Sequence, residues 1–174
     1  MFSKNIKIKN FRLKNLSSKK KNISELLNNL YKSNNQIISS MKNDYKDNYS
    51  KKLLLNFKKI KEVNLIGMGG SILGAKAINN FLKPKSKKFN FIDNYSNLPL
   101  KKNKKINLII SKSGNTLETI SNSNLFINKS DKNIFITENK KNYLINLAYK
   151  LKAEVVYHNN FIGGRYSVLS EVGM

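Results

Sequence analysis

The chain contains no cysteine and a single histidine among its 174 residues. The lack of cysteine excludes disulfide frameworks, thiolate zinc sites, iron–sulfur clusters and cysteine nucleophiles, and one histidine excludes sites that need two. No apolar run approaches the roughly 18 residues of a membrane span, and the basic N-terminus lacks the apolar core of a secretory signal. We therefore expect a soluble, cytoplasmic protein with no membrane partner and no metal site.

Acidic residues are also scarce, because 10 Asp and Glu stand against 33 Lys and Arg, a formal net charge of +23. Such a surface attracts polyanions without specificity. Lysine, asparagine and isoleucine all have A/T-rich codons, however, and the lysines are scattered in short clusters rather than along one helix face. Compositional drift explains most of this charge, so we expect no specific nucleic-acid partner.

The chain divides into two textures, and its 40% hydrophobic content suffices for one core. Residues 1–58 are polar and carry apolar residues at helical spacing, most regularly over 23–31. Weaker patterns over 37–45 and 53–57 favour two further helices. The segment is predicted to be a helical prelude that packs on something else, ahead of a domain at 59–174.

Short apolar runs alternate with helical patterns in this second part of the chain. The alternation predicts βαβ units and an α/β, three-layer αβα domain with a parallel sheet of about five strands. In such sheets ligands bind where the carboxyl ends of strands lead into helix N-termini. The expected strands are 63–66, 89–92, 106–110, 134–136 and 154–157, and the expected helices are 71–82, 116–126 and 143–151.

A glycine-rich segment, GMGGSILG at 67–74, follows the first expected strand. Such a turn into a helix aims backbone N–H groups at an anion, with Ser71 as a helix cap or a hydroxyl donor. The dinucleotide fingerprint would need a third glycine where Ile72 stands, although Asp93 is suitably placed for a ribose contact. The segment alone leaves an anion site, a nucleotide site and a plain turn open.

The segment SKSGNTLET at 111–119 follows the third expected strand and carries four hydroxyl groups and one lysine. A phosphate dianion offers three strong acceptor oxygens, which suit several hydroxyls together with backbone N–H groups. Helix capping would explain one hydroxyl and not the run of four. This segment therefore predicts phosphate binding.

The segment GGRYSVLS at 163–170 places Arg165 after a glycine pair that lets the chain turn sharply. A cation directed into the same crevice would stabilise an oxyanion that develops during a reaction. A surface arginine in a loop is the simpler alternative. Glu138 and Asp93 are more typical of loop or cap positions than of acids or bases, and we interpret His158 as a polar loop residue.

Three segments, GMGGSILGAKA at 67–77, IISKSGNTLET at 109–119 and GGRYSVLSEVG at 163–173, together resemble the glucose-6-phosphate isomerase family of the sugar-isomerase (SIS) fold group. The resemblance covers about residues 55–174. The resemblance implies an enzyme that interconverts glucose 6-phosphate and fructose 6-phosphate through a cis-enediol. It also implies a homodimer at full length and no metal, nucleotide or other cofactor. A bifunctional phosphoglucose/phosphomannose isomerase is a close variant.

The resemblance also assigns roles to individual residues. It implies that Arg165 supports the enediolate as a catalytic residue and that the two strand-end loops hold the phosphate of a hexose 6-phosphate. The expected phosphate-binding residues are Gly70, Ser71, Ser111, Lys112, Ser113, Thr116 and Thr119.

The chain departs from the family at its end. The family's glutamate base, ring-opening histidine and a further lysine come from sequence beyond Met174, and His158 does not match that histidine. Losing a base forfeits about 10²–10⁴-fold of rate, so we expect a truncated chain that binds hexose phosphate without isomerising it. The alternative is a stand-alone SIS-type regulatory module, whose length is normal but which would not need the Arg165 segment.

Overall fold

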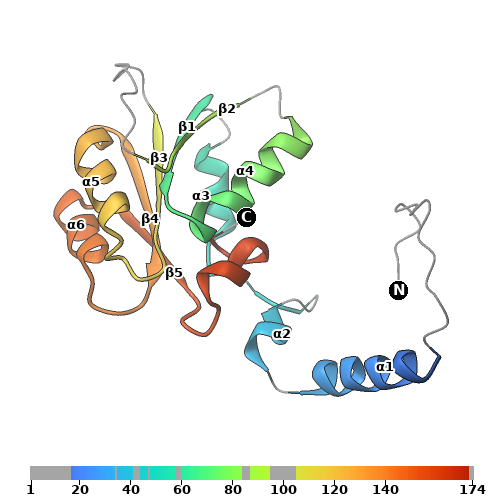
Figure 1. Ribbon diagram of the computed structural model, residues 1–174. Helices are drawn as coiled ribbons and strands as arrows, with labels where there is room; N and C mark the ends of the chain where they lie inside the picture. The colour runs from blue at the N-terminus through green and yellow to red at the C-terminus, as the bar shows by residue number, and fades with distance from the viewer. Residues whose placement is uncertain are drawn as a thin grey trace.

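One five-stranded parallel sheet, with strand order β2-β1-β3-β4-β5, organises the chain (Figure 1). The structure is a computed structural model that describes residues 17–33, 35–40, 44–46, 48–57, 60–83, 87–94 and 105–172. The strands are β1 (Glu62–Gly67), β2 (Lys88–Ile92), β3 (Ile106–Ile110), β4 (Lys132–Glu138) and β5 (Glu154–His158). The helices are α1 (Ser17–Lys32), α2 (Gln36–Ser40), α3 (Lys51–Phe57), α4 (Gly70–Leu82), α5 (Leu117–Phe126), α6 (Tyr143–Leu151) and the 3-10 helix η1 (Gly164–Leu169).

The predicted α/β architecture is confirmed, with each expected strand and helix of the second part present to within a few residues. Helix α6 and strand β3 have the bounds that the apolar pattern predicts. The division between residues 58 and 59 lies outside the described residues and stays a prediction.

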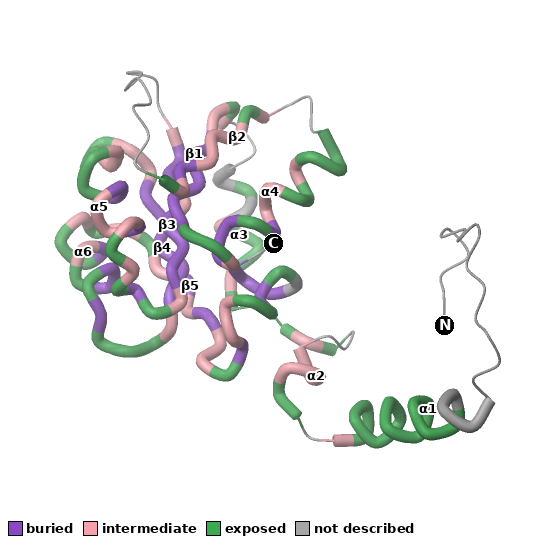
Figure 2. Tube along the Cα trace, viewed as in Figure 1, coloured by how far each residue is buried: buried purple, intermediate pink, exposed green. Residues whose placement is uncertain are grey.

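Helices cover the two faces of the sheet in unequal measure. Helices α5 and α6 lie on one face, where Phe135 and Leu144 are fully buried (Figure 1). Helices α3 and α4 lie on the other face, against Leu65 and its neighbours. Because successive strand residues point to opposite faces, strands covered on both sides are mostly apolar. The buried residues accordingly follow the strands (Figure 2).

An asparagine occupies a matching register position in four neighbouring strands, and we call the row Asn90, Asn64, Asn107 and Asn133 the asparagine ladder. Asn90 Nδ2 donates to Asn64 Oδ1 at 2.9 Å. Asn64 Nδ2 donates to Asn107 Oδ1 at 2.8 Å, and Asn107 Nδ2 donates to Asn133 Oδ1 at 2.8 Å. Because the buried amides are paired, the ladder avoids the cost of unsatisfied polar groups in a core.

The predicted helix over residues 23–31 is confirmed as part of α1. Its apolar stripe, which includes Leu26 at 67% exposed and Leu30 at 45%, is covered by nothing within the part of the chain that the structure describes. Figure 1 shows α1 lying apart from the sheet and its helices. The second predicted helix is shorter than expected, and Met41 at its centre lies outside the described residues.

Candidate functional site

The fold brings the three motif segments together at the carboxyl edge of the sheet. Gly67 and Ile110, the last residues of β1 and β3, are register partners, so the loops that follow them leave the sheet side by side. On its other side the glycine-rich segment meets the segment at 163–170, which we call the Arg165 turn. A Cβ atom on Gly70 would lie 2.5 Å from the Gly164 carbonyl oxygen. The glycine-rich segment therefore lies between the other two.

The glycine-rich segment leads into α4 without a side-chain cap. Gly69 is the N-cap residue, with a φ of 53° that favours glycine, and α4 begins at Gly70. Ser71 is therefore the second residue of the helix, and its interpretation as the cap is wrong. Ser71 is buried, and its hydroxyl has no hydrogen bond to any described residue. The helix start thus offers backbone N–H groups and one hydroxyl without an acceptor.

The loop after β3 arranges its hydroxyls around the start of α5. Ser111 Oγ lies 2.9 Å from Thr116 Oγ1 and accepts a hydrogen bond from Gly114 N at 3.2 Å. Ser113 Oγ accepts from Asn115 N at 3.3 Å and Ser113 is exposed. Thr116 is the N-cap residue of α5, yet its hydroxyl makes no capping bond. Neither Thr116 at the start of α5 nor Gly69 at the start of α4 therefore supplies a side-chain cap.

Helix α6 differs, because its N-terminus has a side-chain cap and the same cap residue contacts the loop at 111–119. Asn142 Oδ1 accepts from Ile145 N at 2.9 Å, which is an ordinary N-cap. The same side chain lies over Gly114, whose φ is 65° and whose Cβ atom would lie 2.1 Å from Asn142 Oδ1. Asn142 Nδ2 also donates to Thr137 Oγ1, which in turn donates to the Lys112 carbonyl at 3.1 Å.

Sequence reasoning missed Asn142 and Thr137 as supports of this loop. The available signal was an asparagine directly before the helical pattern at 143–151, which is typical of an N-cap. The contact with Gly114 could not be found in this way, because it depends on how α6 packs against β4.

Three remaining candidates differ in their surroundings. Lys112 is half-buried and Arg165 is exposed, and neither side chain forms an ion pair with a described residue. Thr119 is 1% exposed on the inner side of α5, and its Oγ1 atom has no hydrogen-bond partner among the described residues. Lys112 and Arg165 can thus reach a ligand directly, whereas Thr119 lies behind the loop surface.

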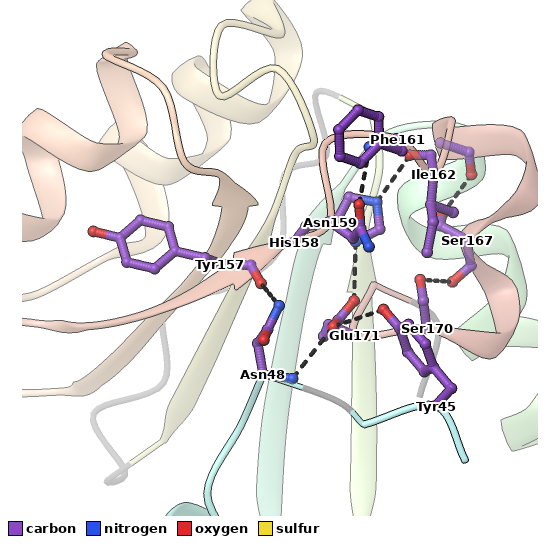
Figure 3. Close-up of polar contacts among 11 residues, drawn as sticks. Tyr45, Asn48, Tyr157, His158, Asn159, Phe161, Ile162, Ser167, Ser170 and Glu171 are labelled. Carbon is purple, nitrogen blue, oxygen red and sulfur yellow. Dashed lines mark hydrogen bonds and ion pairs between the residues drawn. The ribbon is translucent and has the colours of Figure 1, made fainter. Parts of the chain in front are cut away.

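The interpretation of His158 as a polar loop residue is wrong. Strand β5 extends to His158, which is 2% exposed and lies opposite Glu138 in the register. Its ring contacts Glu171, a buried carboxylate that the sequence analysis did not single out (Figure 3). Asp93, considered above for a ribose contact, instead forms an ion pair with Lys76 of α4.

A large hollow lies apart from this edge. A cavity of about 580 Å³ opens beside the sheet face that α3 and α4 partly cover, and its walls are almost entirely apolar, including Leu65, Phe91 and Leu108. An apolar wall does not suit a phosphate dianion. Within the described ranges no cluster of three or more acidic, histidine or cysteine side chains could hold a metal, and no described helix has the length and apolar character to span a bilayer.

The family model of phosphoglucose isomerase matches residues 14–174. The chain belongs to the phosphoglucose isomerase family. It is similar to the glucose-6-phosphate isomerase of Borrelia garinii subsp. bavariensis, with 33% identity over 141 residues, and to that of Methanocaldococcus jannaschii, with 36% identity over 144 residues. These alignments cover 69% and 75% of this chain.

The same alignments cover only 27% and 35% of the two relatives, so the chain spans about a quarter to a third of the length of the curated phosphoglucose isomerases it matches. A crystal structure of a hypothetical protein from Thermus thermophilus has a similar fold, with a TM-score of 0.58 and 25% identity. That likeness covers 68% of this chain and 32% of the Thermus chain. Family membership therefore rests on the part of the chain that includes all three motif segments.

Proposed function

We propose that this chain is the sugar-phosphate-binding part of a glucose-6-phosphate isomerase and binds the phosphate of a hexose 6-phosphate between the starts of α4 and α5. One observation carries the proposal: the neighbouring strands β1 and β3 lead at the carboxyl edge of the sheet into two helices, α4 and α5, that begin without a side-chain cap, and the hydroxyls of Ser111 and Thr116 are paired just before α5. Uncapped N–H groups and the positive end of the helix dipole favour an anion. The curated relatives carry the name glucose-6-phosphate isomerase.

The proposed phosphate contacts come from residues with complementary chemistry. Hydroxyl donors and the Lys112 ammonium face a group with three acceptor oxygens, and each hydrogen bond to such a charged group contributes about 1.5–3 kcal/mol. Thr119 would act from behind, with its unpartnered hydroxyl turned toward a phosphate oxygen or a bridging water. The proposed contacts are Gly70, Ser71, Ser111, Lys112, Ser113, Thr116 and Thr119.

Arg165 is proposed to face the other end of the sugar. In an aldose–ketose isomerisation the proton moves between C2 and C1, and negative charge develops on the enediolate oxygens. A guanidinium group stabilises such oxygens with its positive charge and several N–H donors. The contact of Gly70 with Gly164 and Arg165 supports placing this cation beside the glycine-rich segment of the proposed phosphate site. A module that only sensed a phosphosugar would not need it.

Proton transfer itself is proposed to need a base that these 174 residues do not supply. Arg165 and the phosphate loop would then bind and orient the substrate, while the base comes from the additional sequence that the longer relatives have. A coupled assay from fructose 6-phosphate to glucose 6-phosphate should therefore show no turnover by this chain. Measurable turnover would mean that one of its own carboxylates acts as the base.

Calorimetry with fructose 6-phosphate tests the binding site. We expect the double variant Ser111→Ala, Thr116→Val to bind at least tenfold more weakly, since two hydrogen bonds to a charged group are lost. Ser130→Ala is the matched control, because Ser130 is exposed just before β4, at the opposite edge of the sheet. Work at about 0.2 M salt screens non-specific attraction to the basic surface. Equal affinity of the double variant and the control would remove the assignment.

A further inference from the structure

A buried contact between a histidine and a carboxylate joins the two segments that flank Arg165 in the sequence. His158, the last residue of β5, places Nδ1 3.2 Å from Oε2 of Glu171, which follows η1 (Figure 3). Both side chains are 0% exposed. Removing one partner of a buried pair leaves the other partner's polar group unpaired in the interior. Loss of either side chain is therefore strongly destabilising.

Both members of the pair have further hydrogen-bond partners. His158 Nε2 lies 3.0 Å from the Ile162 carbonyl oxygen, which can only accept, so Nε2 carries a hydrogen. On the other side, Glu171 Oε1 accepts from Tyr45 Oη at 3.1 Å and from Asn48 N at 3.3 Å. Oε1 of the carboxylate thus accepts two hydrogen bonds, while Oε2 faces Nδ1 of His158.

The segment between the two partners is tied to itself at several points. Tyr166 N donates to the Gly163 carbonyl at 2.8 Å, and Ser167 Oγ donates to the Gly164 carbonyl at 2.5 Å. Ser170 Oγ donates to the Ser167 carbonyl at 2.9 Å. These bonds fix the backbone on both sides of Arg165, while its side chain stays exposed and forms no ion pair with a described residue. The backbone of this segment is thus held by its own hydrogen bonds, while the Arg165 side chain faces solvent.

The N-terminal segment takes part in the same closure. Tyr45 and Asn48 precede α3 and reach Glu171 from a distant part of the sequence. Asn48 also donates from Nδ2 to the Tyr157 carbonyl at 3.0 Å, which fastens the segment to β5 (Figure 3). The segment before the sheet therefore contacts both ends of the Arg165 turn.

We propose that His158 and Glu171 are positioning residues that hold the Arg165 turn against the glycine-rich segment, and that Tyr45 and the Asn48 backbone complete this clasp. The inference rests on the proposed role of Arg165 and adds to it the residues that set its place. Two apolar side chains could fill the same space, but only directional hydrogen bonds define where the turn ends lie. A shift of about 1 Å in a charge-stabilising group can cost on the order of 10²-fold in its effect on the reacting group.

A pair of ligands separates positioning from folding. D-fructose 6-phosphate carries the phosphate handle, and D-arabinonate 5-phosphate carries the same handle together with a planar carboxylate in place of the enediolate. The measured quantity is the ratio of their dissociation constants, by calorimetry on the full 174-residue chain. General damage to the fold weakens both ligands alike, whereas a misplaced Arg165 weakens only the carboxylate ligand. Thermal unfolding of each variant is recorded alongside.

We expect Glu171→Ala to reduce the preference for the carboxylate ligand about tenfold, in keeping with the sensitivity of charge stabilisation to position. Glu171→Gln should keep most of it, since a glutamine accepts from Tyr45 and Asn48 and donates to a neutral His158. Tyr45→Phe, which covers the case in which Glu171→Ala fails to fold, should reduce the preference about twofold to threefold. Its matched control is Tyr149→Phe, which removes an exposed phenol that bonds Tyr157 instead.

Arg165→Gln distinguishes the proposed role of Arg165 from the proposed role of the residues that position it. If it abolishes the preference while Glu171→Ala and Tyr45→Phe leave the preference unchanged, the clasp is overturned and the role of Arg165 stands. If Arg165→Gln itself leaves the preference unchanged, the proposed role of Arg165 is overturned and the clasp with it.

Discussion

The carbonyl oxygen of Gly164 lies 2.5 Å from the point that a Cβ atom of Gly70 would occupy, so two glycine-rich segments meet backbone to backbone. At this point the spacing between the glycine-rich segment and the Arg165 turn is set by main-chain contact, and close packing leaves little room to change it.

The first prediction concerns Gly70→Ala. The added methyl group would meet the Gly164 carbonyl group, so the turn must move, and overpacking of this kind costs about 1–3 kcal/mol. We expect a lower melting temperature and a reduced preference for the carboxylate ligand. Gly164→Ala is the control, because a Cβ atom there has nothing within 4 Å. Equal stability of the two variants would contradict the contact.

The second prediction concerns Thr119→Val, a nearly isosteric change. The Thr119 hydroxyl is buried without a described partner, and such a group costs about 1–3 kcal/mol. The variant should therefore be more stable than the wild type in the absence of ligand, by urea unfolding, and should bind fructose 6-phosphate more weakly. Thr137→Val is the contrasting change, since its hydroxyl is bonded on both sides and its loss should destabilise. Unchanged affinity in Thr119→Val would remove Thr119 from the proposed ligands.

The third prediction concerns acid. Burial raises the pKa of Glu171, but hydrogen bonds from His158, the backbone, Tyr45 and Asn48 together lower it by more than burial raises it. The pKa of Glu171 therefore lies below its ordinary value of 4.5. A carboxyl whose pKa is depressed by folding contributes stability that is complete above the unfolded-state value and is lost as pH falls through the folded-state value. Tyr45 is the other titratable side chain in contact with it.

The measurement compares the wild type with the double variant His158→Gln, Glu171→Gln by urea unfolding between about pH 5 and pH 3. The unfolded-state histidine is already protonated in this range, so the difference between the two proteins follows Glu171. We expect the wild type to lose its advantage as the pH falls below about 4.5. A difference that stays constant across the range would show that Glu171 is not held as a carboxylate.

Local pattern predicted much of the fold and the position of two candidate site segments at strand ends. The apolar run at 106–110 and the helical spacing at 143–151 contain their own structural information, and both elements have the expected bounds. The hydroxyl-rich and glycine-rich segments could likewise be placed at strand ends by chain order alone. The identity of the residues and the period of the pattern were sufficient at these positions.

Contacts between distant segments could not be predicted in this way. His158 is followed by two asparagines, which are typical of a loop, and its burial depends on Glu171 and Tyr45 from elsewhere in the chain. The Ser71 cap was wrong for a related reason, because Gly69 adopts a positive φ as the N-cap residue and the helix starts two residues earlier than a Ser71 cap would place it. Both errors arise where local composition suggests a solvent-exposed loop or cap.

The asparagine ladder works as a set of alignment marks for the sheet. A slip of two residues between β1 and β3 would keep the apolar alternation on the same faces, so hydrophobic contact alone discriminates poorly against it. The slip would place Asn64 opposite Ile109, however, and would leave buried amides without partners. The asparagines inside the sheet thus distinguish the observed strand register from a register shifted by two residues.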